Sequence, residues 1–224
     1  MPHLSRTQFG KYMTLLLQAF IVFIIIESLV LRHYTYVFGG ILTLILTILP
    51  MVAERQIRLT IPWWLTFLIV LSLYIHLAGN YFQWYISLYP YYDKIGHLIS
   101  GTTVALLGFA LVLLIDQYSE NNFNRPIIIF LIVMLTMAVG AFWEIFEFTV
   151  DTLLGVNMQH GLNDTMLDMI FVLIGAILVA ALGNIYLRRL SKRTLSRLFM
   201  GNPVLTDRVY SYISELPRQN KKKE

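Results

Sequence analysis

Six carboxyl and imidazole side chains between residues 93 and 168 are arranged in pairs at helical spacing. The pairs are Asp93 with His97, Glu144 with Glu147, and Asp164 with Asp168. Residues three or four apart lie on one side of a helix, so each pair would present its polar groups in one direction. Imidazole with carboxylate suits zinc or manganese, and carboxylate alone suits magnesium. The pattern therefore predicts a divalent-metal site formed between helices.

A metal in such a site would supply a bound water as the nucleophile, with His97 or a spare carboxylate as the general base. We expect His97, Glu144 and Asp168 to be the catalytic residues, because the apolar sequence around them offers no other polar partner. The sequence contains no compact zinc motif such as H-E-x-x-H. The metal prediction therefore depends on separate helices converging.

Some of these polar residues also have structural interpretations. Asp164 follows Asn163 at the start of an expected helix and would serve equally well as its N-terminal cap. Asp93, His97 and Ser100 share a helical face, but one straight helix rarely aims both ring nitrogens of a histidine correctly, so we expect no charge-relay triad. We expect Glu27, His76 and Asn80 to be structural hydrogen-bonding partners. Asp151 is expected to be a solvated helix end, and His160 an exposed loop residue.

Apolar helices must position these residues. The chain is 57% hydrophobic and 13% charged, and its apolar residues occur in long unbroken runs. A run of about 20 apolar residues crosses a bilayer as a helix. Six such helices are predicted, near residues 12–31, 34–52, 63–80, 94–115, 127–148 and 165–187. We expect an all-α polytopic membrane protein, with a transmembrane domain over 1–187 and a basic amphipathic segment and mobile tail over 188–224.

The distribution of basic residues indicates the orientation of these helices. All 17 Lys and Arg residues except Arg32 and Lys94 fall on one side of the predicted membrane, together with both termini. Cytoplasmic segments are enriched in Lys and Arg, so we expect both termini in the cytoplasm of a cell-membrane protein. The net charge of +4 thus reports topology and gives no reason to expect nucleic acid as a partner.

This topology brings the polar residues to one depth. Glu144 would lie roughly 25 Å along its helix, near the outer edge of the hydrocarbon, at 1.5 Å per residue. The helices that begin with Asp93 and with Asp164 enter the membrane from the same outer side. Polar faces avoid lipid and turn toward the bundle or a water-filled cavity. We therefore expect one outer-face pocket with six metal ligands: Asp93, His97, Glu144, Glu147, Asp164 and Asp168.

Three motifs resemble a known family. They are Y-D-K-I-G-H-L-I-S-G at 92–101, W-E-I-F-E-F at 143–148 and Q-H-G-L-N-D-T-M-L-D-M at 159–169, followed by Leu-Ile-Gly at 173–175. Over residues 90–180 the chain is similar to the YjdF-like family of uncharacterised inner-membrane proteins, and it looks like the wider VanZ-like group. The resemblance implies a shared membrane fold and a polar outer-face cluster, and it does not supply a reaction.

The resemblance can be carried over residue by residue. The family's D-x-x-x-H element falls on Asp93 and His97, and its three helix acids fall on Glu144, Asp164 and Asp168. Its two glycines fall on Gly101 and Gly175. Glu147 lies where VanZ-like proteins often have Gln. The chain departs from the pattern at Val172, where many members carry Asp or Asn, and at His160, which is inserted in the polar loop. If the Asp or Asn that many members carry at the position of Val172 is a metal ligand, this chain binds the metal without it or uses His160 instead.

Two flanking segments have membrane character. Residues 80–92 are rich in Trp, Tyr and Phe, which predicts an interfacial belt, with a lid or lipid-binding rim beside Asp93 and His97 as the alternative. Beyond the last span, leucines lie on one helical face flanked by basic residues. They are Leu187, Leu190, Leu195 and Leu198. This pattern predicts a segment along the inner membrane surface that contacts anionic lipid.

Together these features favour a metal-dependent hydrolase or transferase that acts at the outer leaflet on a lipid or lipid-linked envelope intermediate. The alternative is a non-catalytic lipid- or drug-binding resistance protein, whose pocket would need similar residues. A proton-coupled transporter is less favoured, because the inner halves of the last three spans are almost purely apolar.

Overall fold

The structure consists of helices and their connections. It is a computed structural model that describes residues 6–57, 61–118, 122–192 and 194–195. The helices are α1 Arg6–Val30, α2 Tyr34–Ile57, α3 Trp63–Tyr81, α4 Trp84–Ser87, α5 Tyr91–Tyr118, α6 Arg125–Leu154 and α7 Leu162–Arg189. Within these ranges, all but the single-turn α4 are long and apolar enough to cross a membrane, which confirms the six predicted spans.

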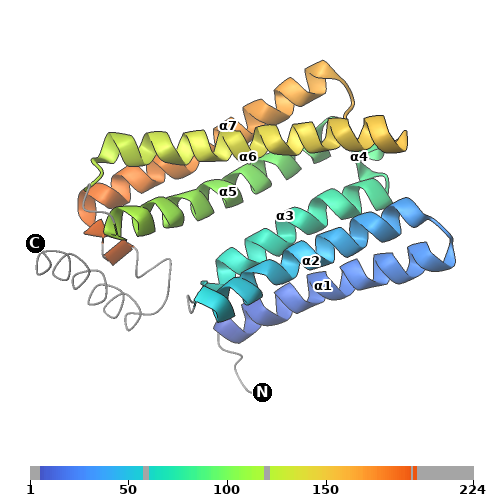
Figure 1. Ribbon diagram of the computed structural model, residues 1–224, viewed down its shortest axis with the longest axis horizontal. Helices are drawn as coiled ribbons and strands as arrows, with labels where there is room; N and C mark the ends of the chain where they lie inside the picture. The colour runs from blue at the N-terminus through green and yellow to red at the C-terminus, as the bar shows by residue number, and fades with distance from the viewer. Residues whose placement is uncertain (1–5, 58–60, 119–121, 193, 196–224) are drawn as a thin grey trace, which may run out of the picture.

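The long helices form two layers of three (Figure 1). One layer contains α1, α2 and α3, the other contains α5, α6 and α7, and α3 packs against α5 between them. No residue of α3 is exposed. The other long helices expose large apolar side chains such as Phe23, Phe38 and Phe142, as expected where a protein faces lipid. The architecture is that of a multi-pass membrane protein.

The two ends of the bundle differ in charge. We call the end where α5 and α7 begin the acidic end, because it carries Asp93 and Asp164. The opposite end, where α6 begins and α7 ends, is the basic end and carries Arg125 and Arg188. The first turn of α1 also lies at the basic end (Figure 1). The cytoplasmic location of this end stays a prediction.

Two glycines allow α5 and α7 to cross closely. A Cβ on Gly175 would lie 2.7 Å from the backbone nitrogen of Thr102, and one on Gly101 would lie 2.8 Å from the Cα of Val172. A side chain at either position would push the helices apart, which explains the small residues. Val172 itself packs toward Gly140 and is a packing residue in this chain. The crossing lies one to two turns from His97 and sets the distance between α5 and α7 at the acidic end.

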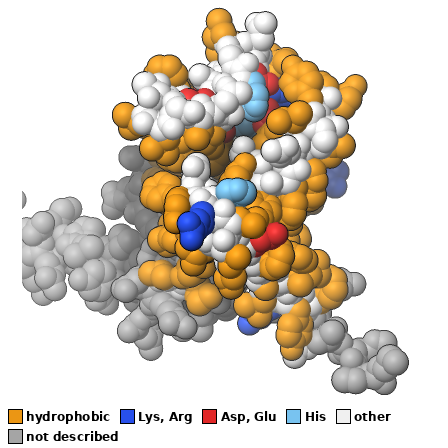
Figure 2. Space-filling model, turned by 90° about the vertical axis from the view of Figure 1, so that its right-hand side faces the viewer, with side chains coloured by type: hydrophobic (Ala, Val, Ile, Leu, Met, Phe, Trp, Pro, Cys, Tyr) orange, Lys and Arg blue, Asp and Glu red, His pale blue; other side chains and the backbone are white. Residues whose placement is uncertain are grey.

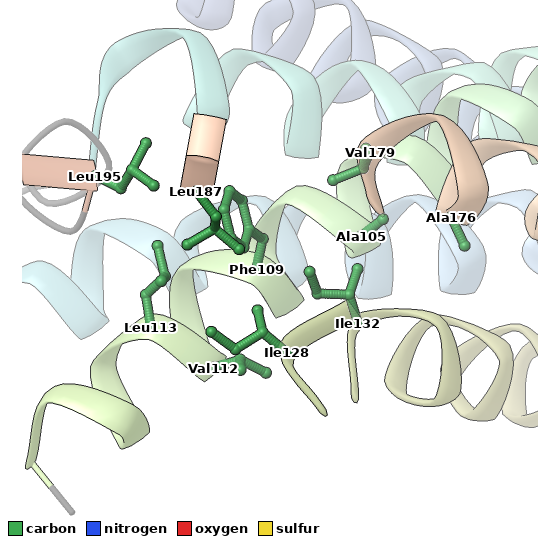
Figure 3. Close-up of a cluster of buried hydrophobic side chains, with 10 residues drawn as sticks. All are labelled: Ala105, Phe109, Val112, Leu113, Ile128, Ile132, Ala176, Val179, Leu187 and Leu195. Atoms are coloured by element: carbon green, nitrogen blue, oxygen red, sulfur yellow. The ribbon is translucent and has the colours of Figure 1, made fainter. Parts of the chain in front are cut away.

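The basic half of the α5–α7 layer has an apolar core (Figure 3). It is formed by Ala105, Phe109, Val112, Leu113, Ile128, Ile132, Ala176, Val179, Leu187 and Leu195. This core separates Asp93 and the residues around it from Asp116, a buried acid near the end of α5. The sequence predicts an almost purely apolar inner half, and Asp116 is an acid that this prediction did not take into account.

The segment after α7 packs inward as far as the structure describes it. Leu195 is 2% exposed within the apolar core, and Leu190 packs against that core. Lys192 Nζ lies 2.8 Å from Asp116 Oδ2 and donates to the carbonyl of Phe123. The prediction that these leucines face the membrane surface is therefore wrong for Leu187 and Leu195, because both are buried in the apolar core of the protein. Leu198 and the rest of the predicted tail lie outside the described residues.

Candidate functional site

A buried lysine lies at the centre of the polar cluster. Lys94 Nζ lies 2.8 Å from Asp93 Oδ2, 2.5 Å from Asp164 Oδ1 and 2.7 Å from Asp168 Oδ1. Lys94 is only 5% exposed. The sequence offers Lys94 as the one basic residue near these acids, but the predicted site residues do not include it. Lys94 is the counter-ion of three carboxylates. Removal of the lysine would leave their buried negative charges without compensation.

His97 completes a group that could hold a metal. Its Nε2 lies 3.3 Å from Asp93 Oδ1 and 3.6 Å from Asp168 Oδ1. One donor atom from each of Asp93, His97 and Asp168 lies within 4.8 Å of the others. Asp93 divides its oxygens, with Oδ2 toward Lys94 and Oδ1 toward His97. Three of the six predicted ligands thus converge from α5 and α7.

Asp164 binds Lys94 instead of capping α7. The helix begins after Gly161, and no side chain caps its first turn. The carboxylate of Asp164 contacts Lys94, and His160 Nδ1 lies 3.5 Å from its Oδ2. The capping interpretation of Asp164 is therefore wrong. His160 is exposed as predicted, and it faces Asp164 rather than the group around His97.

The two glutamates of α6 form the third wall of the cluster. Glu144 is 6% exposed and Glu147 is 9% exposed. Glu147 Oε1 accepts a hydrogen bond of 2.9 Å from Trp143 Nε1, whereas Glu144 Oε2 has no hydrogen-bond partner among the described residues. Both carboxyl groups interact electrostatically with His97 and Asp93. They lie outside the three-residue group, so their direct ligation of a metal, like that of Asp164, stays a prediction.

His76 is a hydrogen-bonding partner, as expected, but the sequence did not identify Tyr85 as its partner. His76 Nδ1 lies 2.8 Å from the Tyr85 hydroxyl, and its ring centroid lies 5.2 Å from that of His97 and 5.1 Å from that of Trp143. Burial, with the Asp93 carboxylate nearby, holds the pKa of Tyr85 well above its usual value, so the phenol stays protonated. The aromatic segment thus contacts the site through Tyr85, and its roles as an interfacial belt or as a lid or lipid-binding rim stay predictions.

Little of the cluster reaches the surface. Figure 2 looks onto the acidic end and shows acidic and histidine side chains as small patches among hydrophobic and uncharged ones. Lys94, His97 and Asp168 are all buried. A group this well shielded from water has stronger electrostatic interactions than an exposed one.

Two further residues are structural. Ser100 Oγ donates to the backbone carbonyl of His97 at 3.2 Å, so Asp93, His97 and Ser100 do not form a triad, as expected. Asp151 accepts hydrogen bonds from the backbone nitrogens of Met158 and Gln159, at 2.7 and 2.8 Å. The interpretation of Asp151 as a solvated helix end is therefore wrong, because its carboxylate holds the connection between α6 and α7.

Comparisons with known proteins agree with this description. Residues 12–189 match the family described as Predicted membrane protein (DUF2238). An uncharacterized protein of Thermotoga maritima is 29% identical over 133 residues, which are 58% of this chain and 67% of that protein. No solved structure matches the chain. The YjdF-like resemblance fits this family loosely, and the relation to the VanZ-like group stays a prediction. Because the match covers all of the polar cluster and the six spanning helices except the first turns of α1, the chain belongs to the DUF2238 family of membrane proteins.

Proposed function

We propose that this protein is a membrane-embedded, metal-dependent hydrolase or transferase that acts on a lipid or a lipid-linked envelope intermediate. The observation that carries the proposal is the group of Asp93, His97 and Asp168, whose donor atoms lie within 4.8 Å of one another. Two carboxylates and an imidazole suit zinc or manganese better than magnesium. Three protein ligands leave a coordination position for water or substrate.

Lys94 is compatible with a metal in this proposal. It holds Asp93 Oδ2 and so orients the other oxygen of that carboxylate toward His97, which is the usual task of a group outside the ligand shell. Three carboxylates contact this one ammonium and two more carboxyl groups interact with His97 and Asp93, so the five acids of the cluster favour further positive charge. They are Asp93, Asp164, Asp168, Glu144 and Glu147.

The proposed chemistry assigns a role to each catalytic residue. A bound metal would activate a water molecule for attack on the lipid-borne group. The carboxyl group of Glu144, whose Oε2 contacts no described hydrogen-bond partner, would accept the proton of that water as the general base. His97 and Asp168 would hold the metal. The site lies at the acidic end, which we expect at the outer membrane surface, where lipid head groups are within reach.

Metal analysis tests this proposal. We expect the purified wild-type protein to retain close to one zinc or manganese ion per chain, and the His97→Ala and Asp168→Asn variants to lose it. Glu27→Gln is the matched control, because Glu27 is an acid at the same end that interacts with Tyr81 instead of the cluster. Wild-type protein without a stoichiometric ion would overturn the metal-dependent proposal.

The Lys94 contacts favour a second candidate, a non-catalytic lipid- or drug-binding protein. Three of the carboxylates already contact a cation, Lys94, which offsets part of their charge without a metal. Lipid profiling of a deletion strain distinguishes the two. The enzyme predicts accumulation of a substrate lipid that wild type reverses and Glu144→Gln does not, whereas an unchanged profile in the deletion strain favours the binding protein.

We also propose that anionic lipid contacts the basic end. A groove of about 650 Å³ between α6 and α7 has two arginines, Arg125 and Arg188, beside the apolar side chains of Ile129, Phe130 and Val133. Basic pockets between spanning helices are typical sites for anionic head groups. The proposed contact of the basic residues after α7 with such lipid follows from the same charge complementarity.

A further inference from the structure

A second cavity, of about 670 Å³, lies between the two layers of helices. Its walls come from α2 and α6 and its floor from α3. Phe38 of α2 and Phe142 of α6 line it and are 62% and 71% exposed, so the cavity is a groove that opens sideways onto the lipid-facing surface. Its volume is that of an ordinary ligand site. A ligand would reach this groove from within the membrane.

The groove is as long as one leaflet is thick. Its lining on α2 runs from Thr35, in the first turn at the acidic end, to Leu46. At 1.5 Å per residue this distance is about 16 Å. The hydrocarbon core of a bilayer is about 30 Å thick, so the groove ends near the middle of the membrane. An acyl chain from the leaflet at the acidic end has the matching length.

The groove is also amphipathic along its length. Its deep part is lined by aliphatic residues such as Leu46, Leu73 and Val139, whereas His76 and Asn80 lie toward the acidic end. A membrane lipid has this same sequence of an apolar chain followed by a polar head group.

His76 connects the groove to the polar cluster. It lines the groove, and its ring packs against those of His97 and Trp143. We infer that the groove between α2 and α6 binds an acyl chain of a membrane lipid from the leaflet at the acidic end and places its head group beside His76 and His97. Lipid binding in the groove is independent of the proposed function; only the identification of this lipid as the substrate rests on it.

Gly39 offers a way to test the groove without disturbing the fold. It lines the groove, and a Cβ at this position would meet no atom within 4 Å. Gly39→Trp therefore fills the groove, and Gly39→Leu does so with a smaller side chain. Ile45→Trp is the matched control, because Ile45 lies on the same helix, is 54% exposed and does not line the groove.

The probe is a phospholipid with a photoreactive diazirine in its acyl chain, carried in vesicles of phosphatidylglycerol and phosphatidylethanolamine. After irradiation of reconstituted protein, peptide mass spectrometry should find wild-type crosslinks at the lining residues of α2 and α6. We expect severalfold fewer crosslinks there in Gly39→Trp and Gly39→Leu, and an unchanged pattern in Ile45→Trp. Crosslinking spread evenly over all exposed helices, or unaffected by both Gly39 variants, would overturn the inference.

The same experiment separates this inference from the proposed function. His97→Ala removes a proposed metal ligand and leaves the groove intact, so its crosslinks at Phe38 and Phe142 should persist. If the metal is absent but the crosslinks depend on Gly39, the groove stands and the metal-dependent enzyme fails. If a metal is bound but the Gly39 substitutions leave the crosslinks unchanged, the enzyme proposal stands and lipid binding in the groove is refuted.

Discussion

At the scale of the residue, Lys94 determines the electrostatics of the site. Without it, Asp93, Asp164 and Asp168 would repel one another in a water-poor environment. With it, Asp93 keeps one oxygen directed toward His97, whereas Oδ1 of Asp168 lies near both Lys94 and His97. One side chain thus stabilises the cluster and arranges the candidate ligands.

Replacement of Lys94 should therefore be costly. We expect Lys94→Met to destabilise the protein by about 3–5 kcal/mol, since breaking a buried ion pair leaves uncompensated charge. Thermal unfolding of the purified protein in detergent measures this loss. Adding Asp164→Asn to Lys94→Met should restore part of the stability, because it removes one of the stranded negative charges.

The control for this prediction is Lys11→Met, which removes an exposed lysine from α1. Its effect should stay within about 0.5 kcal/mol, as is usual for surface substitutions. Equal melting temperatures for Lys94→Met and the wild type would show that the three contacts of Lys94 contribute nothing.

At the scale of the element, the α5–α7 crossing holds the site together. Asp93 and His97 come from one helix and Asp168 from the other, so their separation depends on how closely the helices approach. Gly101 and Gly175 permit that approach. The glycines therefore act on the site without touching it.

An added methyl group at the crossing should weaken both packing and metal retention. Because the new Cβ of Gly175→Ala would press on the α5 backbone, we expect a loss of about 1–3 kcal/mol and a lower metal content. Gly39→Ala is the control: nothing lies within 4 Å of its Cβ, and better helix propensity would add up to about 1 kcal/mol. Thermal unfolding and metal analysis of both variants check this, and a Gly175→Ala protein as stable as Gly39→Ala would contradict it.

At the scale of the whole molecule, the opposite charges of the two ends predict how the protein sits in the membrane. The basic end should face the cytoplasm and the acidic end the outside. The described helices place the start of α1 and the end of α7 at the same end, which agrees with both termini on one side.

The absence of cysteine makes this orientation easy to measure. His33→Cys places a thiol at the acidic end, and Arg189→Cys places one at the basic end; both positions are exposed. In intact cells a membrane-impermeant maleimide should label the first variant only, and permeabilised cells should show labelling of both. Labelling of Arg189→Cys in intact cells would reverse the predicted topology.

The basic end should also distinguish anionic from neutral lipid. We expect phosphatidylglycerol to raise the melting temperature of the wild type above its value in phosphatidylcholine, because Arg125 and Arg188 lie together in one groove. The Arg125→Gln/Arg188→Gln double variant should lose most of this difference. Arg189→Gln, outside the groove, should keep it, and an equal loss in both would show that the effect is one of general charge.

The sequence by itself determined the membrane-spanning helices and the polar faces of α5, α6 and α7. Long apolar runs must form helices in lipid, because a bilayer offers no other partners for backbone polar groups. Helical periodicity then places Asp93 beside His97 and Asp164 beside Asp168 within their own helices. These features are local, so composition and spacing were sufficient to predict them.

Only the tertiary structure decided which of these groups meet. The contact of Lys94 with Asp168, that of His76 with Tyr85, and the burial of Leu195 join segments that are separate in the sequence. The prediction for Asp151 was wrong for the same reason, since its carboxylate accepts a hydrogen bond from the backbone nitrogen of Met158 in the loop after α6. Spacing along one helix carries no information on which helix packs beside it, because that choice depends on close approach at residues such as Gly101 and Gly175.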